Sequence, residues 1–367
     1  MIEEKILKSE ERAIYRLREL YGKYGYLPYK MSKFEEYDLY VRNKDFLIGE
    51  NFITFNDTDG SLLALKPDVT LSIIKNTSDE EGIKEKVYYN ENVYRVSGST
   101  RRFKEIMQTG LECIGDIDIY DTYEVILLAA KSLAEVSDEF ILDVSHMGIF
   151  KAIIDRAGLS LEQNSLLATY ISEKNKHEAE KLLRACNVDD DNIARILSLV
   201  SLYGNTDDVV KKLEEICDTK EARAYLSELK ELCSLLKNSE FYSKIRFDFS
   251  VVNDMNYYNG IVFCGFIADI PEGVLSGGRY DSLMRKMGKK SSAIGFAIYL
   301  DLLEGVGSKK KEYDVDVLVL YSDSVSAQLV TQKVEELVLS GSSVCAQKAI
   351  PEKLRYKALV DLTKGEL

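Results

Sequence analysis

The sequence has few of the residues that build metal sites and nucleophile–base pairs. It contains only two histidines, His146 and His177, and neither stands near a carboxylate or a cysteine in a recognised arrangement. Its six cysteines are scattered and never form a Cys-x-x-Cys pair. Structural zinc sites and disulfide frameworks both need such residues at regular spacing. We therefore expect no metal, no cofactor, no catalytic histidine, and reduced thiols.

Long apolar runs are also absent. No stretch reaches the 18 or so apolar residues that a membrane-spanning helix requires. The N-terminal segment Met1-Ile-Glu-Glu-Lys-Ile6 is charged and lacks the apolar core of a secretory signal. These absences predict a cytoplasmic protein without membrane association.

Positive charge is in deficit. The chain has 48 Lys and Arg residues against 61 Asp and Glu residues, a net charge of −13. Nucleic-acid binding depends on concentrated basic residues that neutralise phosphates. Basic clusters occur at Arg101-Arg102, Lys289-Lys290 and Lys309-Lys-Lys311, and the last is interpreted as a solvated linker. The composition therefore disfavours a nucleic-acid partner.

The pattern of apolar residues predicts an α+β protein of two parts. Strand patterns alternate with helical patterns of irregular length, and Asp59-Gly60 lies between two apolar runs as in a β-hairpin. Residues 150–240 have helical periodicity without a clear strand, which predicts a helical insertion in a main domain of residues 1–307. Residues 308–367 are typical of a short α/β tail.

Periodicity also predicts the individual elements. Helices are expected over residues 6–21, 71–74, 121–136, 280–287, 294–303 and 324–339. Strands are expected over residues 51–55, 61–65, 86–95, 103–114, 245–252 with a continuation through Phe266, 315–321, 343–347 and 358–362. Gln108 and Glu112 are four residues apart in one of these strands, so both should point from the same face.

Five segments resemble the catalytic domain of the histidyl-tRNA synthetases, in the same order over roughly residues 1–305. They are Leu65-Lys-Pro-Asp-Val-Thr70, the motif 2 region from Tyr94 to Glu112, the stretch from Asn253 to Phe263, the Gly-Gly-Arg-Tyr-Asp segment from Val274 to Leu283, and Ala293-Ile-Gly-Phe-Ala-Ile298. Each segment alone is a weak signal, and their common order carries the resemblance. It implies a class II aminoacyl-tRNA synthetase-like domain, an antiparallel sheet flanked by helices, and a tail that resembles a truncated anticodon-binding domain.

The resemblance also implies a site for an amino acid. In that family the acid and the threonine of Leu-Arg-Pro-Glu-x-Thr hold the α-ammonium group, a role that suits Asp68 and Thr70 here. Motif 2 and the tyrosine pair supply the remaining positions. The histidine-binding set that the resemblance implies is Asp68, Thr70, Arg95, Gln108, Glu112, Tyr257 and Tyr258.

Residues that stabilise charge during amino-acid activation are missing. The family's arginine before the tyrosine pair falls on Asn253, and the arginine that closes motif 3 falls on Leu302. Tyr299 replaces a glycine where adenosine should lie, and Ser97 replaces the motif 2 glutamate. Each lost charge contact would cost roughly 3–4 kcal/mol of transition-state stabilisation. We therefore expect no synthetase activity and no catalysis by this chain.

A synthetase-like scaffold with these losses is similar to the regulatory subunits of short-form ATP phosphoribosyltransferase. The resemblance implies a subunit that activates the short catalytic subunit and makes it sensitive to L-histidine, as a homodimer within a hetero-oligomer. Two alternatives stay open. A divergent histidyl-tRNA synthetase would show ATP- and histidine-dependent pyrophosphate exchange, and a stand-alone histidine-sensing paralogue would have no phosphoribosyltransferase partner.

Overall fold

The computed structural model describes residues 7–47, 51–97, 100–252, 257–303 and 312–364. The chain divides into two compact units, Met1–Glu304 and Gly305–Leu367. Within the described ranges, no helix combines the length and the apolar character that crossing a membrane demands.

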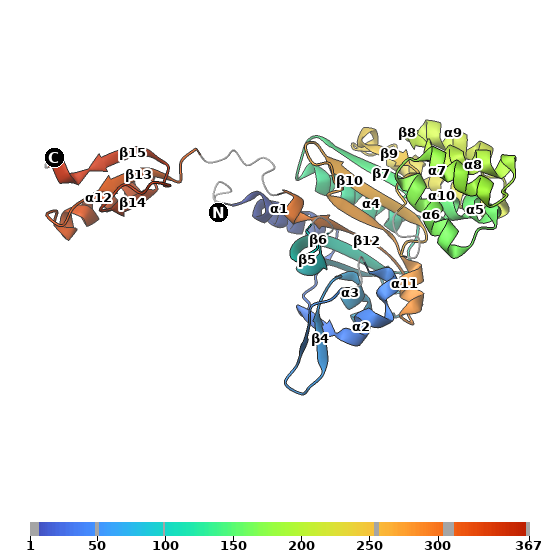
Figure 1. The fold of residues 1–367 in the computed structure, drawn as a ribbon, viewed down its shortest axis with the longest axis horizontal. Coiled ribbons are helices and arrows are strands. Elements are labelled where there is room, and N and C mark those ends of the chain that lie inside the picture. Colours follow the sequence, from blue (N-terminus) through green and yellow to red (C-terminus); the bar gives the residue numbers. More distant parts are fainter. Residues whose placement is uncertain (1–6, 48–50, 98–99, 253–256, 304–311, 365–367) are drawn as a thin grey trace. The chain divides into compact units, whose positions relative to one another are not determined.

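A nine-stranded sheet forms the centre of the first unit (Figure 1), in the order β1-β5-β6-β12-β11-β10-β7-β9-β8. Neighbouring strands are antiparallel except in the β1–β5 and β7–β9 pairs, which are parallel. The α+β prediction is therefore confirmed. The strands are β1 (Leu27–Pro28), β5 (Glu85–Val96), β6 (Phe103–Gly115), β7 (Phe140–His146), β8 (Tyr203–Gly204), β9 (Ile245–Asp248), β10 (Ile261–Ile267), β11 (Leu275–Arg279) and β12 (Ser292–Tyr299).

A small antiparallel sheet in the order β2-β4-β3 precedes β5 in the chain. Its strands are β2 (Phe34–Glu36), β3 (Thr54–Asn56) and β4 (Leu62–Leu65). The turn between β3 and β4 contains Gly60 with a φ of 89°, a conformation that glycine adopts without strain. The hairpin predicted at Asp59-Gly60 is therefore confirmed.

Helices cover both faces of the large sheet. On one face lie α1 (Ser9–Lys23) and α4 (Ile119–Ala134), where the ring of Tyr21 packs 6.1 Å from that of Phe296 in β12. On the other face lie α2 (Tyr37–Arg42), α3 (Thr70–Asn76) and α11 (Asp281–Lys286). These short helices and the small sheet share one apolar cluster with the large sheet, which includes Tyr40, Leu71, Ile74, Tyr89 and Leu283.

Six helices lie between β7 and β9 in the chain, most of them within the region where helical periodicity is strong. They are α5 (Met147–Ile154), α6 (Leu161–Ser172), α7 (Lys176–Ala185), α8 (Asp190–Val200), α9 (Thr206–Ile216) and α10 (Lys220–Leu236). The last five begin at side chains that accept a backbone N–H, which satisfies donors left free at a helix start: Ser160, Asn175, Asp189, Asn205 and Thr219. The two-residue strand β8 also lies in this region. It is too short to show the alternation of apolar and polar residues by which a strand is predicted from sequence.

The helix predicted over residues 294–303 is wrong. Ser292–Tyr299 is strand β12, and only Leu300–Leu303 turns into a 3-10 helix. The strand lies near the middle of the sheet, between β6 and β11, and most of its residues are buried on either face. Such a strand reads as a continuous apolar run without the period-two pattern that identifies a half-exposed strand.

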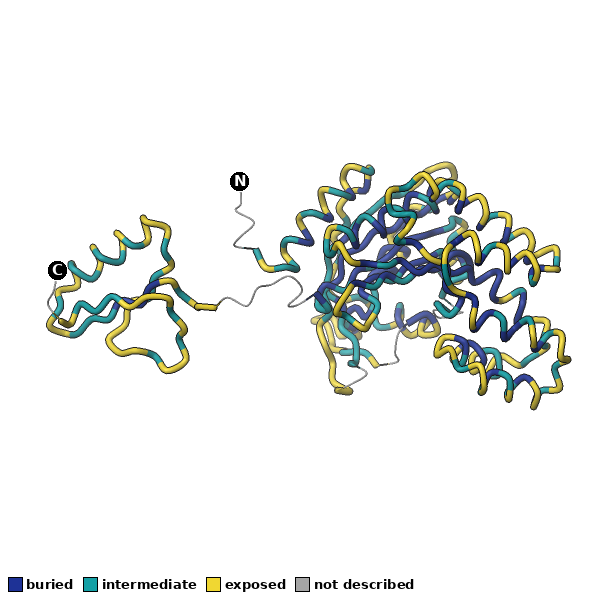
Figure 2. The backbone as a smooth tube through the Cα atoms, turned by 90° about the horizontal axis from the view of Figure 1, so that it is seen from above, coloured by how far each residue is buried: buried dark blue, intermediate teal, exposed yellow. Residues whose placement is uncertain are grey.

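The second unit is a three-stranded parallel sheet with one helix. Strand β13 (Val315–Leu320) lies between β14 (Val344–Gln347) and β15 (Tyr356–Asp361), and α12 (Ala327–Leu339) connects the first two. Burial is concentrated in β13, whereas most other residues of this unit are exposed or intermediate (Figure 2). The strands and helix predicted for the tail are therefore present.

Candidate functional site

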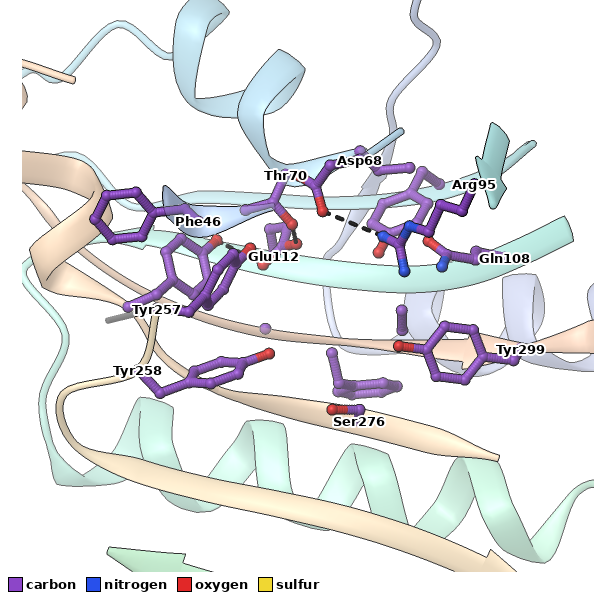
Figure 3. A pocket seen from close by; sticks show the side chains of 16 residues that line it. Phe46, Asp68, Thr70, Arg95, Gln108, Glu112, Tyr257, Tyr258, Ser276 and Tyr299 are labelled. Carbon is purple, nitrogen blue, oxygen red and sulfur yellow. Dashed lines mark hydrogen bonds and ion pairs between the residues drawn. The ribbon is translucent and has the colours of Figure 1, made fainter. Parts of the chain in front are cut away.

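A cavity of about 220 Å³ lies on the face of the large sheet that also carries α3. Side chains from β6, β11 and β12 form its floor, and the segment that joins β4 to α3 lies across from them (Figure 3). Pockets that take drug-sized ligands measure roughly 300–1,000 Å³. The cavity therefore suits a ligand of about the size of one amino acid.

The floor of the cavity is made of small residues on adjacent strands. Gly295 and Ala297 of β12 lie on the same face, and Ser276 of β11 pairs with Ala297. Gly295 pairs with Glu112 of β6, and a Cβ atom at position 295 would overlap the Glu112 carboxyl group. Glycine is therefore required at position 295 if the Glu112 carboxyl group is to keep its place.

Asp68 is held in place at the start of helix α3. Its Oδ1 atom accepts a hydrogen bond from the backbone N–H of Leu71 at 3.0 Å. The Arg95 guanidinium donates from Nε to the Pro67 carbonyl oxygen at 2.6 Å and lies 3.5 Å from Asp68 Oδ2. The side chains of Arg95 and Asp68 are only 10% and 13% exposed. The pair thus places one positive and one negative group side by side in the cavity wall.

Glu112 is the most deeply placed acid of the site. Thr70 Oγ1 donates to its Oε1 atom at 2.8 Å, and the Tyr280 hydroxyl donates to its Oε2 atom at 2.6 Å. Burial raises the pKa of Glu112 to about 8, although these two hydrogen bonds lower it, and the nearby Asp68 charge raises it further. Glu112 therefore holds its proton to a higher pH than an exposed glutamate does.

The pKa of Asp68 is likewise subject to opposing effects of burial and of neighbouring groups. Burial raises its pKa, while the Arg95 guanidinium and the backbone N–H groups of Leu71 and Thr70 lower it. A cationic group placed between Asp68 and Glu112 would favour the ionised form of both. The arrangement therefore suits a ligand that carries an ammonium group.

One end of the cavity is aromatic. The rings of Tyr257 and Tyr258 lie with centroids 4.7 Å apart, and those of Tyr257 and Tyr280 lie 5.9 Å apart. Phe46 approaches Tyr257 with its centroid at 6.3 Å. Packed rings of this kind offer flat faces to a planar group and polar hydroxyls at their tips. They suit the side chain of an aromatic amino acid or of histidine.

Gln108 carries an unused donor into the same cavity. The residue is 2% exposed, and its Nε2 atom has no hydrogen-bond partner among the residues that the structure describes. A buried polar group without a partner costs about 1–3 kcal/mol. A ligand oxygen near this atom would remove that cost.

The structure brings together all seven residues that the sequence analysis selected, because each lines this one cavity: Asp68, Thr70, Arg95, Gln108, Glu112, Tyr257 and Tyr258. Their role toward histidine stays a prediction. Asn253 lies outside the described residues. Leu302 lies in the 3-10 helix after β12 and does not line the cavity.

Two tyrosines were missed by the sequence analysis as site residues. Tyr280 follows the Gly-Gly-Arg sequence directly, so the motif that carries the resemblance already contained it. Tyr89 lines the cavity from β5, where it pairs with Gly110 of β6. The register of two strands decides which of many tyrosines faces the cavity, and the sequence does not display that register.

The two histidines lie away from the cavity. His146 Nδ1 accepts hydrogen bonds from the backbone N–H groups of Gly148 and Ile149 at the start of α5. Its Nε2 atom lies 3.8 Å from Glu228 Oε2 of α10. This corrects the expectation that His146 has no carboxylate neighbour, because Glu228 is distant in sequence and close only in the fold. His177 is exposed on α7.

Across the ranges given above, no three His, Cys, Asp or Glu side chains are grouped so that they could hold a metal ion. The described cavity offers an ion pair, a carboxyl group of raised pKa, an amide and tyrosine hydroxyls. These groups can bind and orient a small zwitterion.

Comparisons with known proteins also find similarity to histidyl-tRNA synthetases and to ATP phosphoribosyltransferase regulatory subunits. The family model "Histidyl-tRNA synthetase" matches residues 3–303. A Bacillus mycoides protein named ATP phosphoribosyltransferase regulatory subunit is 27% identical over 318 residues, which cover 83% of this chain and 75% of that protein. The protein of the same name from Oceanobacillus iheyensis is 29% identical over 298 residues, covering 80% of this chain and 73% of that protein.

Solved structures share the fold. A Bacillus halodurans structure described as an ATP phosphoribosyltransferase regulatory subunit/histidyl-tRNA synthetase aligns with a TM-score of 0.75 and 23% identity, covering 96% of this chain and 93% of that chain. A chain from the ATP phosphoribosyl transferase (HisG:HisZ) complex of Thermotoga maritima aligns with a TM-score of 0.61 and 19% identity, covering 78% and 96%. The resemblance to both groups of proteins is therefore confirmed, and the chain belongs to the histidyl-tRNA synthetase family.

Proposed function

We propose that this chain is a non-catalytic regulatory subunit of ATP phosphoribosyltransferase in histidine biosynthesis. It activates the short catalytic subunit and confers feedback inhibition by L-histidine. The names of its curated relatives support this assignment. The observation that carries it is the cavity, which keeps the groups that suit an amino acid while the motif 3 position for a phosphate-binding arginine is Leu302.

Histidine would bind with its charged groups divided among the cavity walls. Asp68 and Thr70 receive the α-ammonium group, and Arg95 and Gln108 lie where they can bind the carboxylate. Glu112 and the hydroxyls of Tyr257 and Tyr258 receive the imidazole, whose two nitrogens need polar partners. The volume of the cavity and the mixed charge of its lining support a single zwitterion as the ligand.

Loss of synthetase activity follows from the same residues. Activation of an amino acid requires preorganised cations around the α-phosphate of ATP. Leucine at position 302 and asparagine at position 253 carry no charge, and the ring of Tyr299 lies against the cavity. Each missing cation would cost roughly 3–4 kcal/mol in the transition state. The chain therefore acts through a partner and has no reaction of its own.

The partner in this proposal is the short-form catalytic subunit, and the location is the cytoplasm, where the biosynthesis takes place. Closed symmetry is the rule for soluble oligomers, so two copies of this chain would form a homodimer within the hetero-oligomer. Allosteric inhibition requires that histidine bind one state of this assembly more tightly than the other.

Reconstitution with a short catalytic subunit from the same organism tests the proposal. We expect the two chains to co-purify and phosphoribosyl-ATP formation to rise when this chain is added. A catalytic subunit that is equally active alone would contradict the proposal. ATP- and histidine-dependent pyrophosphate exchange by this chain alone would establish a divergent synthetase instead, and histidine binding without any such partner would establish a stand-alone sensor.

A further inference from the structure

The cavity ends at a large residue, although its floor is made of small ones. Residues 295, 297 and 299 of β12 alternate onto the same face of the sheet and are glycine, alanine and tyrosine. Across the neighbouring strand β6, these positions pair with Glu112, Gly110 and Gln108. The Tyr299 ring therefore lies where the small residues of the floor end, beside Gln108 Nε2, which has no hydrogen-bond partner within the described part of the chain.

Three hydrogen-bond donors meet at this end. Figure 3 shows Arg95, Gln108 and Tyr299 together on one side of the cavity, with the Tyr299 hydroxyl pointing into it and Phe46 and Tyr257 at the opposite end. Arg95 acts directly on Tyr299, because its charge and hydrogen bonding lower the pKa of the phenol while burial raises it more strongly. Glu112 lies farther along the same cavity, whereas Asp68 is paired with Arg95 at 3.5 Å. The end at Tyr299 thus combines a guanidinium, an amide and a phenol as donors.

We infer that Tyr299 determines specificity by binding the free α-carboxylate of the amino acid, with Arg95 and Gln108, and by closing the cavity beyond it. This inference rests on the proposed function and adds the class of ligand that the site accepts. A phenol, a guanidinium and an amide N–H₂ are all donors, and a carboxylate offers acceptor sites on two oxygens. An amino acid whose carboxylate is linked to a nucleotide would collide with the ring.

The first test compares ligands and variants by isothermal titration calorimetry. L-Histidine carries the carboxylate, whereas L-histidinol replaces it with an uncharged alcohol. Tyr299→Phe keeps the ring and removes only the hydroxyl. We expect this variant to lose about 10- to 100-fold in affinity for histidine, the range for a hydrogen bond to a charged group, and to bind histidinol as the wild type does.

Tyr258→Phe provides the matched control at the aromatic end of the cavity. It should weaken histidine and histidinol binding by the same factor, because both ligands carry the imidazole. A Tyr299→Phe variant whose preference for histidine over histidinol equals that of the wild type would overturn the inference. No histidine binding by the wild-type chain would overturn the proposed function itself, so the two failures are distinguishable.

A second variant tests the closing role of the ring. Tyr299→Ala should bind a non-hydrolysable sulfamoyl analogue of histidyl adenylate at least tenfold more tightly than the wild type does. Thermal unfolding of the variant, followed by circular dichroism, establishes that it is folded. A folded Tyr299→Ala protein that gains no affinity for this analogue would contradict the role of the ring as the wall of the cavity.

Discussion

Gly295 of β12 lies directly opposite Glu112 of β6, and a Cβ atom at position 295 would overlap the Glu112 Oε2 atom and the Leu111 carbonyl oxygen. The buried carboxyl group therefore occupies space that only a glycine leaves open. In this position it reaches both Thr70 and Tyr280. One residue without a side chain thus decides whether the deepest polar group of the cavity keeps its partners.

Gly295→Ala should damage both stability and binding. The added methyl group would force Glu112 away from Thr70 and Tyr280, and overpacking of this kind typically costs about 1–3 kcal/mol of unfolding free energy. Urea unfolding and histidine titration measure the two effects. Gly22→Ala is the matched control, since a Cβ atom at this position of α1 meets nothing within 4 Å. Equal stability of the two variants would contradict the close packing at Gly295.

Glu112→Gln should stabilise the empty protein at high pH. The folded-state pKa of about 8 lies above the ordinary value of 4.5, so the folded chain retains a proton that the unfolded chain releases. Wild-type stability therefore falls between pH 4.5 and 8, by at most about 1.4 kcal/mol per pH unit. The variant lacks this loss. The unfolding free energy of the variant, measured with urea, should exceed that of the wild type by more at pH 8 than at pH 5. An equal difference at both pH values would count against a buried, protonated Glu112.

Asp68→Asn should separate recognition of the ammonium group from recognition of the rest of the ligand. The change removes the negative charge but keeps the size of the side chain. We expect histidine to bind about 10- to 100-fold more weakly, as for loss of a charged hydrogen bond. Imidazolepropionate lacks the ammonium group, so its affinity should fall far less between the wild type and the variant. If both ligands lost affinity by the same factor in fluorescence or calorimetric titrations, Asp68 would not be the ammonium partner.

Lys66→Met should destabilise the region around the cavity. Lys66 is fully buried, and its Nζ atom lies 2.6 Å from Glu91 Oε2 and 3.1 Å from the Ser32 carbonyl oxygen. Removing one partner of a buried ion pair leaves the other uncompensated and typically costs about 3–5 kcal/mol.

The exposed pair of Lys23 and Glu19 in α1 supplies the control for Lys66. Lys23→Ala should leave the unfolding free energy nearly unchanged, because water screens an exposed ion pair. Chemical denaturation of both variants measures the difference. A Lys66→Met protein as stable as the wild type would show that the buried pair contributes nothing.

The order of the family-like motifs, with strand parity for Gln108 and Glu112, was enough to predict seven of the residues that line the cavity. Gln108 and Glu112 share strand β6 at a spacing of four, and the helix predicted over residues 71–74 lies within α3. Features that depend on contacts between distant parts of the chain could not be predicted from the sequence. Strand β12 is covered on both faces and was predicted as a helix, and Tyr89 enters the cavity only through its register with Gly110. Glu228 approaches His146 because α10 packs near α5.

The most direct test of the proposed regulatory function is the histidine dependence of phosphoribosyl-ATP formation in the reconstituted complex. The wild-type chain should stimulate the short catalytic subunit, and histidine should reverse that stimulation. A complex that contains Asp68→Asn should be stimulated equally and should need at least tenfold more histidine for inhibition. Absence of stimulation, or inhibition at the same histidine concentration with both chains, would contradict the proposal that this cavity senses histidine for a catalytic partner.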